Sequence, residues 1–229
     1  MLSRLLTVTS DAHDPARVAR FWGALLGQEV VEDSGGVLVP GDDRRPGLRF
    51  VPSQARMARP NLMHLHLTST TDEDQQETVA KVLALGGSHL DVGQRPEEGH
   101  VVLADPEGYE FDVIEAGNRF LAGTGFLGEV ACDGTRAVGL FWSEALGWPL
   151  VWDENEETAI QSPHGGTKVS WGGPPVAPKT GRSRQRFEFT VTGDEEVERL
   201  VALGAKRLTL DGAEVLTDPD GNEFTVTAG

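Results

Sequence analysis

The sequence predicts an α+β protein built from four copies of one strand-helix-three-strand module. Two near-repeats support this prediction: the turn DPEGYEF at residues 105–111 returns as DPDGNEF at 218–224, and ARFWGALLG at 19–27 returns as GLFWSEALG at 139–147. Two independent repeated segments indicate an internal duplication of the chain. Within each half, the order strand, helix, three strands occurs twice.

The duplication divides the 229 residues into two domains of ordinary size. We expect a first domain at 1–117 with modules at about 1–60 and 61–117, a linker at 118–124, and a second domain at 125–229 with modules at about 125–183 and 184–229.

The first module is expected to begin with a short strand at 5–9 and a helix at about 15–26. Asp14 and Pro15 provide an N-cap and a proline at the first helical position. Apolar residues at i, i+3, i+4 and i+7 give this helix one buried face, and Gly27 ends it. Three short strands should follow at 29–31, 37–39 and 48–51.

The same order of elements is expected in the other three modules. The second should have a strand at 62–68, a helix from Asp72 to Gly86, and strands at 88–92, 100–103 and 110–115. The third should have a strand at 126–131, a helix through 138–146, and strands near residues 150, 159 and 169. The fourth should start at Arg186, continue with a helix at 195–203, and end on a strand at 222–227.

The composition is that of a soluble, turn-rich protein. The chain is 38% hydrophobic with 28 glycines and 13 prolines, and it contains no apolar run long enough to span a bilayer. Its first residues lack the apolar stretch of a secretory signal, and Cys132 is its only cysteine. We therefore expect a cytoplasmic protein that does not bind membranes.

The charge argues against nucleic acid as a partner. The net charge is −16, whereas phosphate binding requires clustered Lys and Arg side chains. The nearest basic cluster is Arg182, Arg184 and Arg186, which alternate with Ser183 and Gln185 at the start of a predicted strand. This alternation predicts a solvated strand edge rather than a binding patch.

The modules, the Phe-Trp pair followed by Leu-Gly on the first helix of each half, and the Asp-Pro-Asp/Glu-Gly turn together resemble the vicinal-oxygen-chelate superfamily over almost the whole chain. That superfamily includes glyoxalase I, extradiol dioxygenases, fosfomycin-resistance enzymes and bleomycin-binding (bleomycin resistance) proteins. The likeness is greatest to tandem glyoxalase-like proteins of the actinobacterial type. It implies two tandem glyoxalase-like domains whose paired modules form cupped, mostly antiparallel sheets, with the ligand on the concave face.

The resemblance also implies where a divalent metal would bind. Enzymes of the superfamily use a histidine on the opening strand of a module, matched by His64, and a carboxylate seven residues after the Asp of the turn, matched by Asp112. His66 lies on the same sheet face as His64, because residues two apart on a strand point to the same side. The first strand of the chain has no serviceable third ligand, but Glu129 on the opening strand of the third module is a substitute outside the family's register. His64, Asp112 and Glu129 would suit Zn, Mn, Ni or Fe.

The second half of the chain departs from this pattern. Arg186 stands where the histidine belongs and Thr225 where the carboxylate belongs, so no metal is expected there. Glu188 is the equivalent of His66. Trp171 belongs to a tryptophan-rich third module whose aromatic side chains could line a ligand-binding cleft. The candidate ligand contacts are therefore His64, His66, Arg186, Glu188 and Trp171.

Three functions follow as hypotheses. The first is a small-molecule-binding protein without a cofactor, which holds an organic ligand in the cup that contains His64 and His66 for sequestration, sensing or resistance. The alternative is a divalent-metal-dependent lyase, isomerase or dioxygenase that uses His64, Asp112 and Glu129. The third is a metal-free enzyme with His66 or Glu188 as general base. A monomer and a homodimer are both feasible.

Overall fold

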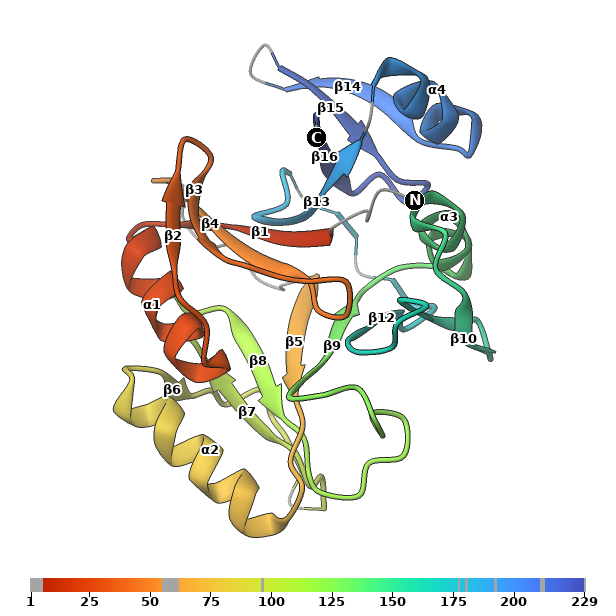
Figure 1. Cartoon of the computed structure of the whole chain (residues 1–229). Coiled ribbons are helices and arrows are strands. Elements are labelled where there is room, and N and C mark those ends of the chain that lie inside the picture. Colours follow the sequence, from red (N-terminus) through yellow and green to blue (C-terminus); the bar gives the residue numbers. More distant parts are fainter. Residues whose placement is uncertain are drawn as a thin grey trace.

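The computed structural model describes residues 6–54, 62–95, 97–176, 178–179, 181–191, 193–210 and 213–228. Its strands form two eight-stranded sheets, here called sheet I and sheet II (Figure 1). Sheet I contains β1 (Leu6–Ala12), β2 (Val31–Asp33), β3 (Gly36–Val39), β4 (Gly47–Pro52), β13 (Gln185–Val191), β14 (Lys206–Leu210), β15 (Ala213–Thr217) and β16 (Glu223–Ala228).

Sheet II is built in the same way from the middle of the chain. It contains β5 (Met63–Leu67), β6 (Ser88–His89), β7 (Val101–Ala104), β8 (Glu110–Val113), β9 (Leu127–Cys132), β10 (Leu150–Glu154), β11 (Glu157–Gln161) and β12 (Lys168–Trp171). The helices are α1 (Pro15–Leu26), α2 (Asp72–Ala84), α3 (Arg136–Leu146) and α4 (Asp194–Ala202). The predicted α+β class with four strand-helix-three-strand modules is confirmed.

Each sheet joins two modules through their opening strands. The strand order is β14-β15-β16-β13-β1-β4-β3-β2 in sheet I and β10-β11-β12-β9-β5-β8-β7-β6 in sheet II. Thus β1 pairs antiparallel with β13, and β5 pairs antiparallel with β9. The first module therefore shares a sheet with the fourth, and the second with the third. Each sheet contains strands from both sides of the expected linker at 118–124. The division of the chain into domains at 1–117 and 125–229 stays a prediction.

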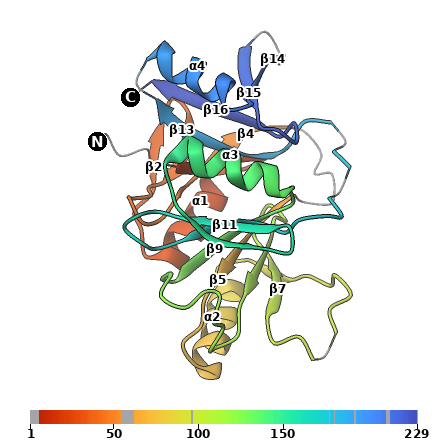
Figure 2. The same cartoon turned by 90° about the vertical axis from the view of Figure 1, so that its right-hand side faces the viewer.

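Helices α1 and α3 lie between the two sheets, as the two views of the chain in Figures 1 and 2 show. On α1, which packs on β4 and β3, Trp22 also reaches Phe111 of β8 with 4.9 Å between the ring centroids. On α3, which packs on β11 and β12, Trp142 reaches Phe187 and Phe224 of sheet I with 5.0 Å between centroids in each pair. The buried aromatic face predicted for each helix therefore joins the sheets into one core.

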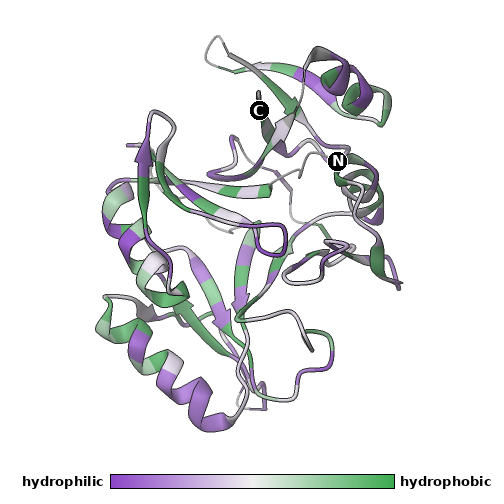
Figure 3. Cartoon of the chain, viewed as in Figure 1, coloured by the Kyte–Doolittle hydropathy of each residue, from purple (hydrophilic) through white to green (hydrophobic). Residues whose placement is uncertain are grey.

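Strand alternation separates this core from a polar face on each sheet. In β5, Met63, Leu65 and Leu67 are buried, whereas His64 and His66 are partly exposed on the other side. Figure 3 shows the same alternation of hydrophobic and hydrophilic residues along the neighbouring strands, and it shows the mainly hydrophilic surface of α2. None of the helices in the described part of the chain is long and apolar enough to cross a membrane.

The sequence prediction was least accurate at the sheet edges. A strand expected at 29–31 is found at Val31–Asp33, and one expected at 88–92 is reduced to Ser88–His89. Both β2 and β6 lie at the end of a sheet and are exposed along their whole length. An edge strand has only one neighbour, so its bounds depend on that pairing more than on its own apolar pattern.

The two equivalent tryptophans differ in one hydrogen bond. Trp22 Nε1 donates to Asp105 Oδ2 at 3.0 Å, whereas Trp142 Nε1 is buried without a hydrogen-bond partner among the described residues. At the equivalent turn, Asp218 Oδ2 accepts from Asn222 Nδ2 at 3.1 Å. Burial raises the pKa of Asp105 to about 6, although the hydrogen bond from Trp22 acts in the opposite direction.

This difference predicts unequal effects of matched substitutions. Trp22→Phe should lower the free energy of unfolding by about 1–3 kcal/mol more than Trp142→Phe, because it leaves a buried carboxylate oxygen without its donor. Both substitutions remove the same number of atoms from a helix face, so urea denaturation of the two variants isolates the hydrogen bond. Equal losses of stability would contradict the role assigned to the Trp22–Asp105 contact.

Candidate functional site

The candidate site lies at the middle of sheet II, where two modules meet. The antiparallel register of β5 and β9 pairs His66 with Glu129, and the parallel register of β5 and β8 pairs His66 with Asp112. On the next strand, β12, Lys168 is paired with Glu129. We call the surface formed by these side chains the polar face of sheet II; it comprises His64, His66, Asp112, Glu129, Lys168 and Ser170.

A buried ionic cluster forms the centre of this polar face. His66 Nδ1 lies 2.7 Å from Glu129 Oε2, and His66 Nε2 lies 3.2 Å from Asp112 Oδ2. The second oxygen of Glu129 accepts a hydrogen bond from Ser170 Oγ. The side chains of His66, Asp112 and Glu129 are only 18%, 13% and 7% exposed, so water screens these contacts weakly.

His66 is an imidazolium at neutral pH. Burial by itself lowers its pKa, but hydrogen bonds to Asp112 and Glu129 and the charges of both carboxylates outweigh burial and raise the pKa to about 9. In the charged form, both ring nitrogens carry hydrogens and each donates to one carboxylate. The cluster is therefore a cation held between two anions.

Two polar atoms of this face have no partner in the described part of the chain. His64 stacks on His66 with 6.0 Å between ring centroids and an interplanar angle of 5°, and its Nδ1 is buried without a hydrogen bond. Asp112 Oδ1 is likewise buried and unpaired. Buried polar atoms are normally satisfied, so these two atoms are exceptions among the polar groups of this face.

Lys168 connects the ionic cluster to an aromatic border. Its ammonium group donates to the backbone carbonyl of Phe120 and lies 4.2 Å from the centroid of the Phe120 ring. The Phe120 ring in turn contacts Trp152 edge-on with 6.0 Å between centroids. Desolvation lowers the pKa of Lys168, and the nearby charge of Glu129 partly opposes this effect.

Sequence reasoning missed Lys168 and Ser170, although a signal was present. The two residues alternate with Val169 and Trp171 in β12, which pairs with the strand that carries Glu129. This alternation could have placed both on the face of Glu129, but only after the pairing of β12 with β9 was known.

The structure does not bring all of the expected ligand contacts together. Arg186 and Glu188 lie on sheet I, where Arg186 Nη1 pairs with Asp11 Oδ1 at 2.8 Å and Glu188 Oε2 accepts from Thr9 Oγ1 at 3.0 Å. Trp171 is 2% exposed and lies on the face of β12 opposite to Ser170. Of the five expected contacts, only His64 and His66 belong to the polar face of sheet II.

The expectation of a solvated arginine edge was wrong for two of the three arginines. The side chains of Arg184 and Arg186 are each only 10% exposed, and both contact residues of other modules. Sequence alternation could not reveal this burial, because it arises where β13 meets β1 and the turn before β8.

The side chains present do not fit a divalent metal ion as they are arranged. Two of the expected metal ligands, Asp112 and Glu129, contact the same histidine, but that histidine is His66 and not the expected His64. Within the described ranges, no group of three or more His, Cys, Asp or Glu side chains could hold a metal ion. Both ring nitrogens of the His66 imidazolium are engaged by carboxylates, so a metal ion that bound this ring would have to displace one of its protons.

The paired modules and the polar face in the middle of the sheet define the class of protein: a tandem member of the vicinal-oxygen-chelate superfamily. The chain belongs to the family described as "Glyoxalase-like domain", whose model matches residues 7–114 and again 129–227.

Solved structures agree on the fold. Glyoxalase I from Zea mays is 14% identical with a TM-score of 0.63, and the match covers 98% of this chain and 92% of that one. A putative dioxygenase from Bacillus subtilis is 13% identical with a TM-score of 0.61, and the match covers 97% of this chain and 84% of that one. A search of curated proteins finds no match.

The charged state of His66 predicts a specific dependence of stability on pH. The folded-state pKa is about 9 and the free side chain titrates near 6.5, so the cluster contributes up to about 3 kcal/mol that is fully present below pH ~6.5 and is lost as the pH rises through about 9. The Tm of the wild type should therefore fall relative to that of His66→Gln between pH 6 and pH 10.

A matched control is available on the same strand. His64→Gln leaves the His66 cluster in place and should keep the fall in Tm with pH. Parallel Tm profiles for the wild type and His66→Gln would contradict the assignment of an imidazolium, and the ¹⁵N shifts of the His66 ring provide a direct check.

Proposed function

We propose that this protein binds a small organic molecule on the polar face of sheet II and that it does so without a metal ion. The observation that carries the proposal is the Asp112–His66–Glu129 cluster, which is fully charged and lies beside two unpartnered polar atoms, His64 Nδ1 and Asp112 Oδ1. The superfamily fold supports a small-molecule site at this position.

The cluster is arranged in advance of binding. Glu129 is held by His66 and Ser170, and Asp112 is held by His66, so these side chains need little reordering when a ligand arrives. Preorganisation of this kind raises affinity by reducing the entropy lost on association. A ligand hydroxyl or amide group would donate to Asp112 Oδ1, and a second polar group would meet His64 Nδ1.

The charge balance favours an uncharged ligand. The imidazolium of His66 and the ammonium of Lys168 face the carboxylates of Asp112 and Glu129, so the four charges cancel. The Phe120 and Trp152 rings at the border supply apolar contact for a flat group. We therefore propose a neutral ring compound with hydroxyl or carbonyl groups as the ligand class, bound for sequestration, sensing or resistance.

Metal content provides one test. Protein purified without chelators should retain far less than one equivalent of metal after incubation with Mn, Fe(II), Ni or Zn and removal of the excess, because both nitrogens of His66 are engaged by carboxylates. Mass spectrometry of wild type and His66→Ala should give the same low content. Near-stoichiometric metal in the wild type that is lost in His66→Ala or His64→Ala would overturn the metal-free proposal and support a metal-dependent lyase, isomerase or dioxygenase.

Ligand binding provides the second test. We expect ring compounds with hydroxyl and carbonyl groups, such as 4-hydroxybenzamide and resorcinol, to raise the Tm of the wild type in a thermal-shift screen. Asp112→Asn should weaken a hit by about tenfold or more, because it replaces a carboxylate acceptor next to His66.

The duplication offers a matched control for this substitution. Thr225 occupies the position of Asp112 on sheet I, seven residues after the equivalent turn aspartate, so Thr225→Ala should leave the affinity unchanged. A hit that is retained in Asp112→Asn, or lost equally in both variants, would place the ligand elsewhere.

A further inference from the structure

A cavity lies at the junction of the two sheets, on the core-facing side of sheet II. Its volume is about 90 Å³, and its apolar walls include Met63, Cys132, Trp142, Trp171 and Phe187. Trp171 faces away from Ser170 on its strand, so this cavity is separate from the polar face that carries the proposed function.

Arg184 lines this cavity and leaves two of its donors unused within the described part of the chain. Its Nη2 donates to the backbone carbonyl of Asp11 at 3.0 Å and lies 3.5 Å from Glu107 Oε1. Its Nε and Nη1 are buried and have no hydrogen-bond partner within the described ranges. The guanidinium carbon lies 5.8 Å from the centroid of the Tyr109 ring, which is another wall of the cavity.

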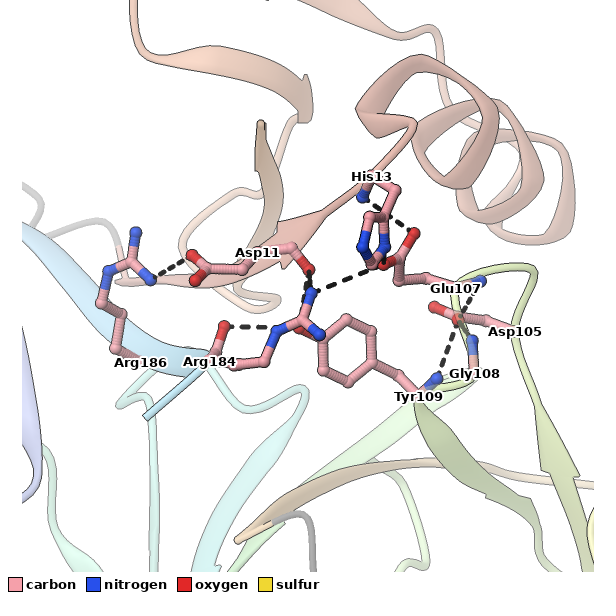
Figure 4. Close-up of polar contacts among 8 residues, drawn as sticks. All are labelled: Asp11, His13, Asp105, Glu107, Gly108, Tyr109, Arg184 and Arg186. Carbon is pink, nitrogen blue, oxygen red and sulfur yellow. Dashed lines mark hydrogen bonds and ion pairs between the residues drawn. The ribbon is translucent and has the colours of Figure 1, made fainter. Parts of the chain in front are cut away.

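The residues around Arg184 hold it in position and are themselves already paired. The Tyr109 hydroxyl donates to the same Asp11 carbonyl at 2.7 Å, and the Asp11 carboxylate pairs with Arg186 at 2.8 Å (Figure 4). Glu107 receives the backbone N–H of His13 at 3.0 Å and contacts the His13 ring at 2.5 Å. Of the nearest acids, Asp11 is paired with Arg186 and Glu107 contacts only Nη2 of Arg184, so neither satisfies Arg184 Nε or Nη1.

Trp142 adds a third unused donor to the same cavity. The residue is 1% exposed, and its Nε1 has no partner among the described residues, whereas the equivalent Trp22 donates to Asp105. All three unsatisfied atoms are donors, and a buried donor without a partner destabilises the folded protein. The cavity is therefore matched to a molecule that brings hydrogen-bond acceptors.

The charge of the lining is compatible with an anion. Four cationic side chains and three acidic ones line the cavity, in a chain whose net charge is −16. One acid and one cation, Glu223 and Lys179, pair with each other at 2.5 Å, and Arg186 pairs with Asp11 at 2.8 Å. Burial raises the pKa of a second, Asp218, which favours its neutral form.

We propose that this cavity binds a small monocarboxylate of about two to four carbon atoms. Its volume of about 90 Å³ suits a short carboxylate better than a large metabolite. The carboxylate oxygens accept from Arg184, whose planar guanidinium is well suited to this partner. Trp142 Nε1 supplies a further donor, and the short apolar tail contacts Met63, Cys132 and Trp171.

Cys132 provides a readout located in the cavity itself. It is the only cysteine of the chain and it lines the cavity, so its rate of modification by methyl methanethiosulfonate reports on this space alone. Burial raises the pKa of the thiol, and the reaction is therefore followed at alkaline pH. Saturating propionate should slow the modification of the wild type by about tenfold.

Substitutions distinguish carboxylate binding from a general effect of the salt. Arg184→Gln should abolish protection by propionate, and Trp142→Phe should raise the concentration needed for half-protection by about fivefold, the loss expected for one hydrogen bond. Trp22→Phe is the matched control at the equivalent position and should leave protection unchanged. Circular dichroism confirms that each variant is folded, and Trp142→Phe carries the test if Arg184→Gln does not fold.

Several results would overturn the proposal. Absence of protection in the wild type at 100-fold excess over reagent, or equal protection in Arg184→Gln, would mean that the cavity holds only ordered water. Equal protection by inorganic phosphate would reject a carboxylate with an apolar tail. If the buried thiol does not react, calorimetric titration of wild type and Trp142→Phe with propionate decides the question, and the absence of heat in the wild type would reject the site. The metal and ring-compound tests of the polar face are unaffected by any of these outcomes.

Discussion

The antiparallel pairing of β5 with β9 is the interaction on which the candidate site depends. A single module forms a short mixed sheet whose opening strand has one free edge, and such an edge is satisfied only by another strand. Here the opening strand of the next module satisfies it, and the register places His66 between Asp112 of its own module and Glu129 of the other. The same pairing of β1 with β13 places Arg186 beside Asp11. The His66–Glu129 and Arg186–Asp11 contacts therefore exist only because two modules meet there.

The ionic cluster shows how one scaffold can change its chemistry without changing its fold. A lone buried histidine becomes harder to protonate, since burial disfavours the charged form. Two carboxylates reverse this effect at His66 and raise its pKa to about 9. The side chain is then a fixed cation that orients Asp112 and Glu129. The number of carboxylates that contact the ring therefore decides whether the histidine is charged at neutral pH.

Divergence between the two halves explains why the two equivalent tryptophans differ in their hydrogen bonds within the described residues. In the first half, Trp22 and Asp105 satisfy each other. In the second half, Asn222 takes the place of Tyr109 and bonds the turn aspartate, so the indole of Trp142 loses its partner. A substitution at a single turn position can thus free a buried donor on a helix 80 residues away in the sequence, because the turn and the helix face share one set of hydrogen bonds.

The sequence by itself determined the features of this protein that depend on local geometry. The four modules, the buried face of α1, the turns before β8 and β16, and the shared face of His64 and His66 follow from periods of 3.6 and 2 residues and from turn chemistry. Tertiary structure decided which histidine meets the carboxylates, that Arg184 and Arg186 are buried, and that Trp171 faces the core. These outcomes depend on which strands pair and in which register, and such long-range pairing is set by the packing of the whole chain rather than by residues adjacent in sequence.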